Sequence, residues 1–134
     1  MKIKKQVFDE MIQHCKSCFP YEACGIIGGK NDMATEIYKI KNTEASSVSY
    51  FMEPEEQLKA MKDMKSKGLD MIAIFHSHPF GSAYPSSKDI ELSFYDVYHV
   101  IIALNPYGDN LIFEAKCFKI KDGKVYEEEL IIEQ

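Results

Sequence analysis

The chain has 134 residues, of which 46% are hydrophobic and 28% charged, and it carries a formal net charge of −5. This length suits one domain over residues 1–134, and the acidic balance argues against a nucleic-acid partner, which would need a basic stripe. All 16 basic residues are lysine, which excludes the planar bidentate clamp that arginine forms on carboxylates and phosphates.

Neither a membrane span nor a secretion leader is expected from the sequence. No apolar run approaches the roughly 18 residues that indicate a transmembrane helix. The basic start at residues 1–5 resembles that of a signal peptide, but Asp9 and Glu10 interrupt the apolar core that would have to follow. We therefore expect a cytoplasmic protein.

The N-terminal third predicts one helix and two strands. Apolar side chains recur at helical spacing over residues 4–18, and Pro20 closes this amphipathic helix. Residues 23–29 are predicted to form a strand that ends in a glycine turn. Residues 35–41 alternate apolar and polar side chains, as a half-exposed strand does.

The middle of the chain predicts a short strand, a helix and a buried strand. The short strand is expected at residues 50–52, after a polar loop. The helix starts near Pro54 and ends at Gly68. Residues 71–75 are entirely apolar, which is typical of a central strand covered on both faces.

The C-terminal third predicts three further strands, at residues 97–104, 110–120 and 124–132. The last two flank Asp122-Gly123, a strong hairpin turn. The order of elements implies an α/β fold of the α+β kind, in which a mixed β-sheet is flanked by helices on both faces.

The four cysteines allow three interpretations. Cys15 and Cys18 have the spacing of half a zinc finger, but Cys24 and Cys117 are isolated and supply no second pair. A disulfide is a second possibility, although cytosolic disulfides are uncommon. The interpretation we favour is packing, because Cys15 falls on the apolar face of the first helix.

The most informative pattern is His76-Ser77-His78 followed by Ser86 and Asp89. The histidines follow the apolar strand directly, and alternate side chains of a strand point to the same face, so both rings can converge on one ion. Two imidazoles and a carboxylate are a common ligand set for catalytic zinc, which keeps one position for water. The plainer alternative is a buried histidine pair with a capped helix behind it.

A loop and a short helix are expected to bring the carboxylate to the histidines. Residues 79–85 contain two prolines and a glycine, so they form a loop. Ser86 with an acid three residues later is typical of a helix N-terminus, and the following Ile90, Leu92 and Phe94 are apolar. Ser86 and Asp89 would then share a face turned toward the strand end.

A zinc hydrolase also needs a general base, and the residues alone do not choose one. No glutamate stands beside the two histidines, so Glu22, Glu53 and Glu91 all stay open. Ser86 itself has two possible roles, as helix N-cap or as a catalytic hydroxyl.

Four other polar residues are assigned lesser roles. Ser77 and Ser87 are expected to support the site or to be merely exposed. His14 and His99 are read as structural.

Two segments carry a resemblance to a known family. Residues 20–28, Pro-Tyr-Glu-Ala-Cys-Gly-Ile-Ile-Gly, and the His-Ser-His-Pro to Pro-Ser-Ser-Lys-Asp stretch at 76–89 resemble the JAMM, or MPN-plus, zinc metalloproteases. The resemblance implies a JAMM/MPN domain with cytidine-deaminase-like architecture. It also implies that His76, His78 and Asp89 bind one Zn²⁺ with a water as fourth ligand. Glu22 becomes the general acid/base and Ser86 the stabiliser of the tetrahedral intermediate.

The same resemblance implies the substrate. JAMM enzymes cleave the amide bond after the C-terminal tail of a ubiquitin-like protein, and this chain is similar to the minimal, stand-alone prokaryotic type. We expect a zinc (iso)peptidase acting on a ubiquitin-like or sulfur-carrier protein with an extended tail, and a homodimer is possible.

Three alternative functions are less well supported by the sequence. A non-catalytic MPN scaffold would usually lack metal ligands, and all are present here. A deaminase would need His-x-Glu with Pro-Cys-x-x-Cys, which do not occur. A cell-wall or phage-tail peptidase of the same family stays open.

Overall fold

The computed structural model describes residues 1–93 and 95–134. Phe94, which we expected on the apolar face of the short helix, lies outside the described residues. The elements are, in chain order, β1 (Lys2–Lys4), α1 (Lys5–Cys18), β2 (Cys24–Lys30), β3 (Met33–Ile40), α2 (Pro54–Ser66), β4 (Asp70–His78), α3 (Ser87–Glu91), β5 (Tyr98–Tyr107), β6 (Asn110–Lys121), β7 (Lys124–Glu128) and β8 (Ile131–Glu133).

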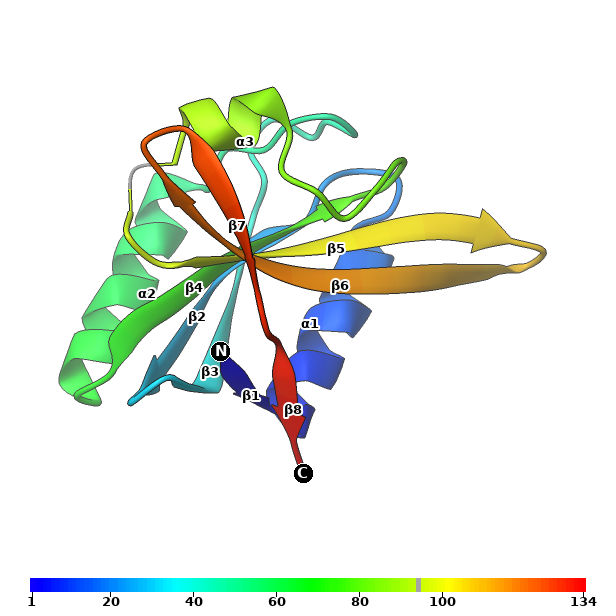
Figure 1. The fold of residues 1–134 in the computed structure, drawn as a ribbon. Helices are drawn as coiled ribbons and strands as arrows, with labels where there is room; N and C mark the ends of the chain where they lie inside the picture. The colour runs from blue at the N-terminus through cyan, green and yellow to red at the C-terminus, as the bar shows by residue number, and fades with distance from the viewer. Residues whose placement is uncertain (94) are drawn as a thin grey trace.

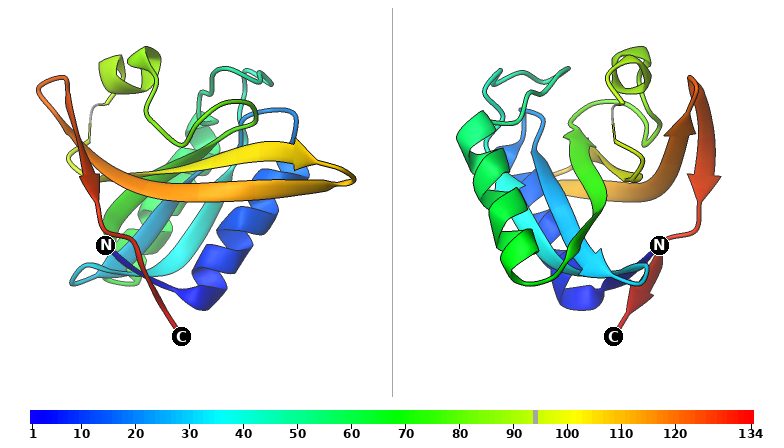
Figure 2. Two further views of the ribbon diagram at one scale, coloured as in Figure 1. Left: turned by 45° about the vertical axis from the view of Figure 1, so that its right-hand side comes forward. Right: turned by 90° about the vertical axis from the view of Figure 1, so that its left-hand side faces the viewer.

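Within the described residues the strands form one mixed sheet in the order β7-β6-β5-β4-β2-β3-β1-β8. The β4–β5, β1–β3 and β1–β8 pairs are parallel, and the other neighbours are antiparallel. The sheet curls strongly, so that β5 and β6 sweep across the molecule while β2, β3 and β4 stand beside the helices (Figures 1 and 2). The predicted α+β fold with a mixed sheet is confirmed.

Helices α1 and α2 cover opposite faces of the central strands. Because successive side chains of a strand point to opposite faces, Ile26 of β2 packs with α2 while its neighbour Ile27 packs with α1. The same alternation holds in β4, where Ile74 joins the α2 side and Phe75 the α1 side. The apolar run over residues 71–75 therefore lies in a central strand covered on both faces, as predicted. The cytidine-deaminase-like detail of this architecture stays a prediction.

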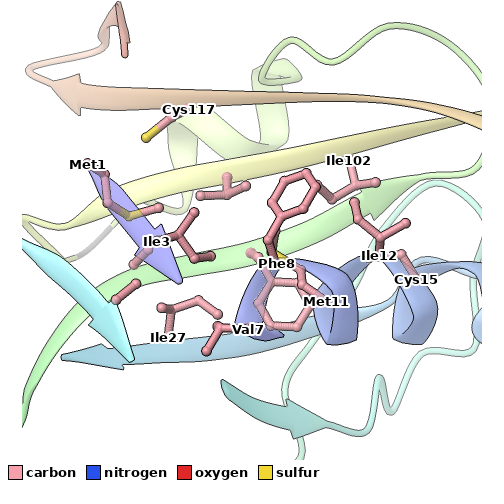
Figure 3. Close-up of a cluster of buried hydrophobic side chains, with 14 of the residues drawn as sticks. Met1, Ile3, Val7, Phe8, Met11, Ile12, Cys15, Ile27, Ile102 and Cys117 are labelled. Atoms are coloured by element: carbon pink, nitrogen blue, oxygen red, sulfur yellow. The ribbon is translucent and has the colours of Figure 1, made fainter. Parts of the chain in front are cut away.

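Helix α1 packs one face into the larger core. Its buried side chains recur at the spacing that predicted the helix, and Figure 3 shows them converging on β1, β2 and β5; they are Val7, Phe8, Met11, Ile12 and Cys15. All four cysteines are free, and Cys15 is fully buried in this cluster. The packing interpretation is thus confirmed, and the disulfide interpretation is wrong for this structure.

The predicted turns are found at two of the glycines. Gly68 adopts φ +69° and ends α2, and Asp122-Gly123, both with positive φ, joins β6 to β7. No helix among the described residues is long and apolar enough to cross a bilayer.

Four details differ from the sequence prediction. The glycine turn predicted at the end of residues 23–29 is wrong, because β2 continues through Gly28 and Gly29 to Lys30, and the chain turns at Asn31-Asp32, both with positive φ.

The other three differences lie at short strands. β1 was missed because only Ile3 is buried in it, and it exists because it pairs with β3 and β8. The strand predicted over residues 124–132 is divided, since the chain leaves β6 after Glu128 and pairs with β1 from Ile131. Residues 50–52 form no strand but a single bridge between Asn42 and Met52.

Gly25 offers a test of how closely the central strands pack. A Cβ atom there would lie 2.3 Å from the Phe75 ring and 2.4 Å from the Tyr38 carbonyl oxygen, whereas at Gly28 it would meet the flexible end of Met64 at 3.0 Å. We expect Gly25→Ala to lower the free energy of unfolding by about 3 kcal/mol and Gly28→Ala by about 1 kcal/mol or less. Urea unfolding of both variants measures this, and equal losses would contradict the predicted contact.

Candidate metal centre

The carboxyl end of β4 brings His76 and His78 to one place. Both point to the same face of the strand, and their Nε2 atoms are 3.1 Å apart. Asp89, at the third position of α3, places Oδ2 3.1 Å from Nε2 of His76 and 3.2 Å from Nε2 of His78. The structure thus brings together all three of the residues that the sequence proposed as ligands.

The first turn of α3 fixes the carboxylate of Asp89. Ser86 is the N-cap residue: its Oγ accepts from the Asp89 N–H at 3.1 Å, while its own N–H donates to Asp89 Oδ2 at 2.8 Å. This reciprocal capping box confirms the helix start that Ser86 and Asp89 predicted. The N-cap role of Ser86 is therefore real, and its catalytic role stays a proposal.

The orientation of His78 leaves Nε2 available to a metal. Its Nδ1 lies 2.9 Å from the Ser82 carbonyl oxygen, which can only accept, so Nδ1 must carry the hydrogen. In neutral His78 the Nε2 lone pair then points toward Asp89. A carbonyl that holds the far nitrogen in this way is the usual support of a metal-binding histidine.

The charges at the site also suit a cation. Burial alone would raise the pKa of Asp89, but hydrogen bonds with His76, His78 and the Ser86 N–H hold that pKa well below its usual range. Burial lowers the pKa of His76, which favours the neutral ring. Burial opposes charge on His78 as well, but hydrogen bonds with Asp89 and the Ser82 carbonyl raise the pKa of His78, so this ring must release its proton when a metal binds. An ionised carboxylate with neutral imidazoles is the protonation state in which these groups bind metals.

The spacing of the three atoms fits a metal ion. Atoms with lone pairs at 3.1–3.2 Å from one another repel unless shared protons or a cation lie between them. Ligands of a tetrahedral zinc ion, each about 2 Å from the metal, stand about 3.3 Å apart. The three side chains therefore form a site that can hold a metal ion of zinc's size.

Glu22 lies buried close to this group. Its side chain is 4% exposed, and among the described residues its Oε1 has no hydrogen-bond partner. Burial raises the pKa of Glu22 to about 7, although the nearby His78 opposes this shift. The other two candidates for the general base lie in different surroundings. Glu53 caps α2 by accepting from the Glu56 N–H, and Glu91 is exposed on α3.

The sequence did not decide whether Ser77 supports the site or is merely exposed. Ser77 is fully buried, its Oγ accepts from the Ala23 N–H at 2.8 Å, and its own N–H donates to the Ala23 carbonyl. These bonds tie the segment that carries Glu22 to the strand that carries both histidines. Ser87 is exposed.

Two histidines lie outside the metal site. His99 is buried and hydrogen-bonded to Ser93, as expected of a structural residue, and His14 packs edge-on against Phe75.

A small apolar cleft opens beside His76 and Asp89. Its volume is about 190 Å³, and its apolar wall comes from the segment before α2, from β4 and from the residues that follow α3; it includes Val48, Tyr50, Phe51, Ile74, Leu92 and Tyr95. Nothing in the sequence pattern pointed to this wall, because most of its residues belong to loops.

The fold and the site define the class of the protein: it is a mixed α+β domain with a candidate His-His-Asp metal site at the end of a central strand. The model of the prokaryotic homologs of the JAB domain matches residues 4–115. The chain therefore belongs to this family, and the resemblance to JAMM/MPN proteins is confirmed.

Proteins named for an enzymatic activity are similar to this chain. It is 30% identical over 136 residues to a CysO-cysteine peptidase of Mycobacterium tuberculosis, covering 98% of this chain and 91% of the relative. It is also 39% identical over 70 residues to a desampylase of Pyrococcus furiosus, covering 52% of this chain and 50% of the relative.

Solved structures show the same fold. A protein from Desulfitobacterium hafniense, 35% identical, superposes with a TM-score of 0.85 over 99% of this chain and 92% of its own. A structure described as a JAMM metalloprotease-like zinc site in the proteasome and signalosome, 25% identical, gives a TM-score of 0.62 over 100% and 98%.

The burial of Glu22 predicts a pH-dependent stability difference. With a pKa near 7 in the folded chain and the ordinary 4.5 when unfolded, Glu22 ionises first in the unfolded chain, so the wild type loses stability as the pH rises from about 4.5 to 7. Glu22→Gln cannot ionise, and it should gain roughly 3 kcal/mol relative to the wild type across this range, since one pKa unit corresponds to about 1.4 kcal/mol.

Urea unfolding at a series of pH values, in EDTA, measures this difference. Glu91→Gln, at an exposed position, is the control and should show no such trend. A constant difference between Glu22→Gln and the wild type from pH 4 to 8 would show that Glu22 is not buried as described.

Proposed function

We propose that this chain is a zinc-dependent peptidase or isopeptidase that hydrolyses the amide bond after the C-terminal tail of a ubiquitin-like or sulfur-carrier protein. The observation that carries the proposal is the group of His76, His78 and Asp89 with the buried carboxyl of Glu22 close by. Relatives named for cleaving such carriers support it, namely the CysO-cysteine peptidase and the desampylase.

His76, His78 and Asp89 would hold one zinc ion through two imidazole nitrogens and one carboxylate oxygen. When bound in such a site, zinc keeps a coordination position for water, lowers the pKa of that water to about 7 and polarises the substrate carbonyl. Ser82 and Ser86 support this set, because their backbone groups hold His78 and Asp89 in place.

Glu22 would act as the general acid/base. Its carboxyl would take a proton from the attacking water and deliver it to the departing amine. A pKa near 7 suits both halves of this task at neutral pH, and such proton transfer contributes roughly 10²- to 10⁴-fold in rate. The bonds between Ser77 and Ala23 would keep the carboxyl in reach of the metal site.

Ser86 would donate a hydrogen bond to the oxyanion of the tetrahedral intermediate. Its Oγ accepts from the Asp89 N–H through a lone pair, so the hydroxyl hydrogen is still able to donate. The residue is exposed and bonded directly to Asp89, so a substrate carbonyl at the site could reach it. Capping and catalysis are therefore compatible in one side chain.

The extended tail would lie in the apolar cleft beside His76 and Asp89. Its exposed rim residues Val48 and Phe51 give the tail an apolar surface to bury. A cytoplasmic location, a homodimer, the absence of a nucleic-acid partner and a single domain over residues 1–134 stay predictions.

Two variants separate metal binding from catalysis. Glu22→Gln should keep zinc and lose about 10²- to 10⁴-fold in activity, because only the proton transfer is removed. His76→Ala should lose both. Zinc content is measured by elemental analysis. Cleavage of a carrier that is extended beyond its C-terminal tail, or joined through that tail to a lysine, is measured by intact mass spectrometry.

The control for this pair is Glu91→Gln, which should behave like the wild type. Full activity of Glu22→Gln would remove Glu22 from its role. A zinc-loaded wild type that cleaves no carrier would count against the proposed substrate.

The two roles of Ser86 can be separated with glycine. Glycine at an N-cap costs only a few tenths of a kcal/mol, so Ser86→Gly should keep α3 and the zinc site while it removes the hydroxyl. We expect activity to fall by about 10²- to 10³-fold with zinc content unchanged. Activity equal to that of the wild type would leave Ser86 with the capping role alone, and Ser87→Gly serves as the neighbouring control.

A further inference from the structure

The two histidines of the metal site are oriented in different ways. His78 donates from Nδ1 to the Ser82 carbonyl, which fixes its ring. His76 is 1% exposed, yet its Nδ1 has no hydrogen-bond partner among the described residues. A metal-binding histidine is normally held by a bond from its far nitrogen, so something else must orient this ring.

The ring of Tyr50 lies against the ring of His76. Their centroids are 4.8 Å apart and their planes differ by 26°, which is a stacked arrangement. The other aromatic neighbour, His78, is tilted by 59° at 4.9 Å. A flat ring on one face of the imidazole resists rotation about χ2, the motion that would turn Nε2 away from Asp89.

The backbone on both sides of Tyr50 is held in place by hydrogen bonds with Asn42. The side chain of Asn42 donates to the Ser49 carbonyl and accepts from the Phe51 N–H, so it grips the residues on both sides of Tyr50. The same Asn42 also donates to the Glu22 carbonyl. One side chain thus links the segment carrying Tyr50 to the segment carrying the proposed general base.

We propose that Tyr50 is a positioning residue that orients His76 for metal binding by ring stacking, in place of the hydrogen bond that His78 makes to Ser82. The inference rests on the proposed zinc site and adds a residue that neither the metal-ligand pattern nor the catalytic set includes. It assigns the role to the ring of Tyr50 and not to its hydroxyl.

The test compares Tyr50→Leu with Tyr50→Phe, using Zn²⁺ affinity from chelator competition and the visible spectrum of the Co²⁺-loaded protein. Tyr50→Phe keeps the ring and should match the wild type in both. Tyr50→Leu should bind Zn²⁺ at least about tenfold more weakly, the lower range for loss of a group that orients a ligand. Its Co²⁺ spectrum should also change, and Tyr50→Met replaces it if the leucine variant does not fold.

Tyr38→Leu is the matched control. Tyr38 packs against the same apolar cluster as Tyr50 but touches no ligand, so its loss should lower stability and leave Zn²⁺ affinity unchanged. Wild-type affinity in folded Tyr50→Leu, or equal losses in Tyr50→Phe and Tyr50→Leu, would overturn the proposal. A wild type that binds no Zn²⁺ would instead overturn the proposed function, and a zinc-binding wild type without peptidase activity would leave the role of Tyr50 standing.

Discussion

The site depends on how the carboxylate of Asp89 is held between two imidazoles. Its Oδ2 accepts from the Ser86 N–H and lies 3.1–3.2 Å from both Nε2 atoms. Two local conformations produce this arrangement, the alternation of side chains in β4 and the capping box of α3. The loop between them has only to return the chain to the strand end, so most of the precision of the site is encoded within short range.

This is why the His-His-Asp group could be predicted from the sequence and the proposed general base could not. His76, His78 and Asp89 belong to patterns with a known period or cap. Glu22 is brought to them by the antiparallel pairing of β2 with β4, in which Cys24 stands opposite His76. That register is a tertiary property, so the residues alone left Glu53 and Glu91 open, and only the family resemblance favoured Glu22.

The same difference between local patterns and tertiary pairing explains which elements of the fold were predicted wrongly. The helix at Lys5–Cys18 and the central strand at Asp70–His78 carry long apolar patterns, and both were predicted. β1 and β8 span three residues each and exist because they pair with each other and, for β1, with β3. Too few side chains are buried in such short strands to produce a recognisable hydrophobic periodicity in the sequence. Tyr50 was overlooked for a related reason, because its contact with His76 depends on a loop held by Asn42.

The arrangement of charges is unfavourable for stability, which itself argues for function. Glu22 is buried with a pKa near 7, so its ionisation at neutral pH opposes folding. His76 is buried with no hydrogen-bond partner for Nδ1 among the described residues. An apolar side chain of similar size at either position would avoid the desolvation of a polar group. Two such groups beside a convergent His-His-Asp set are therefore explained by the chemistry they can perform, and stability alone gives no reason for them.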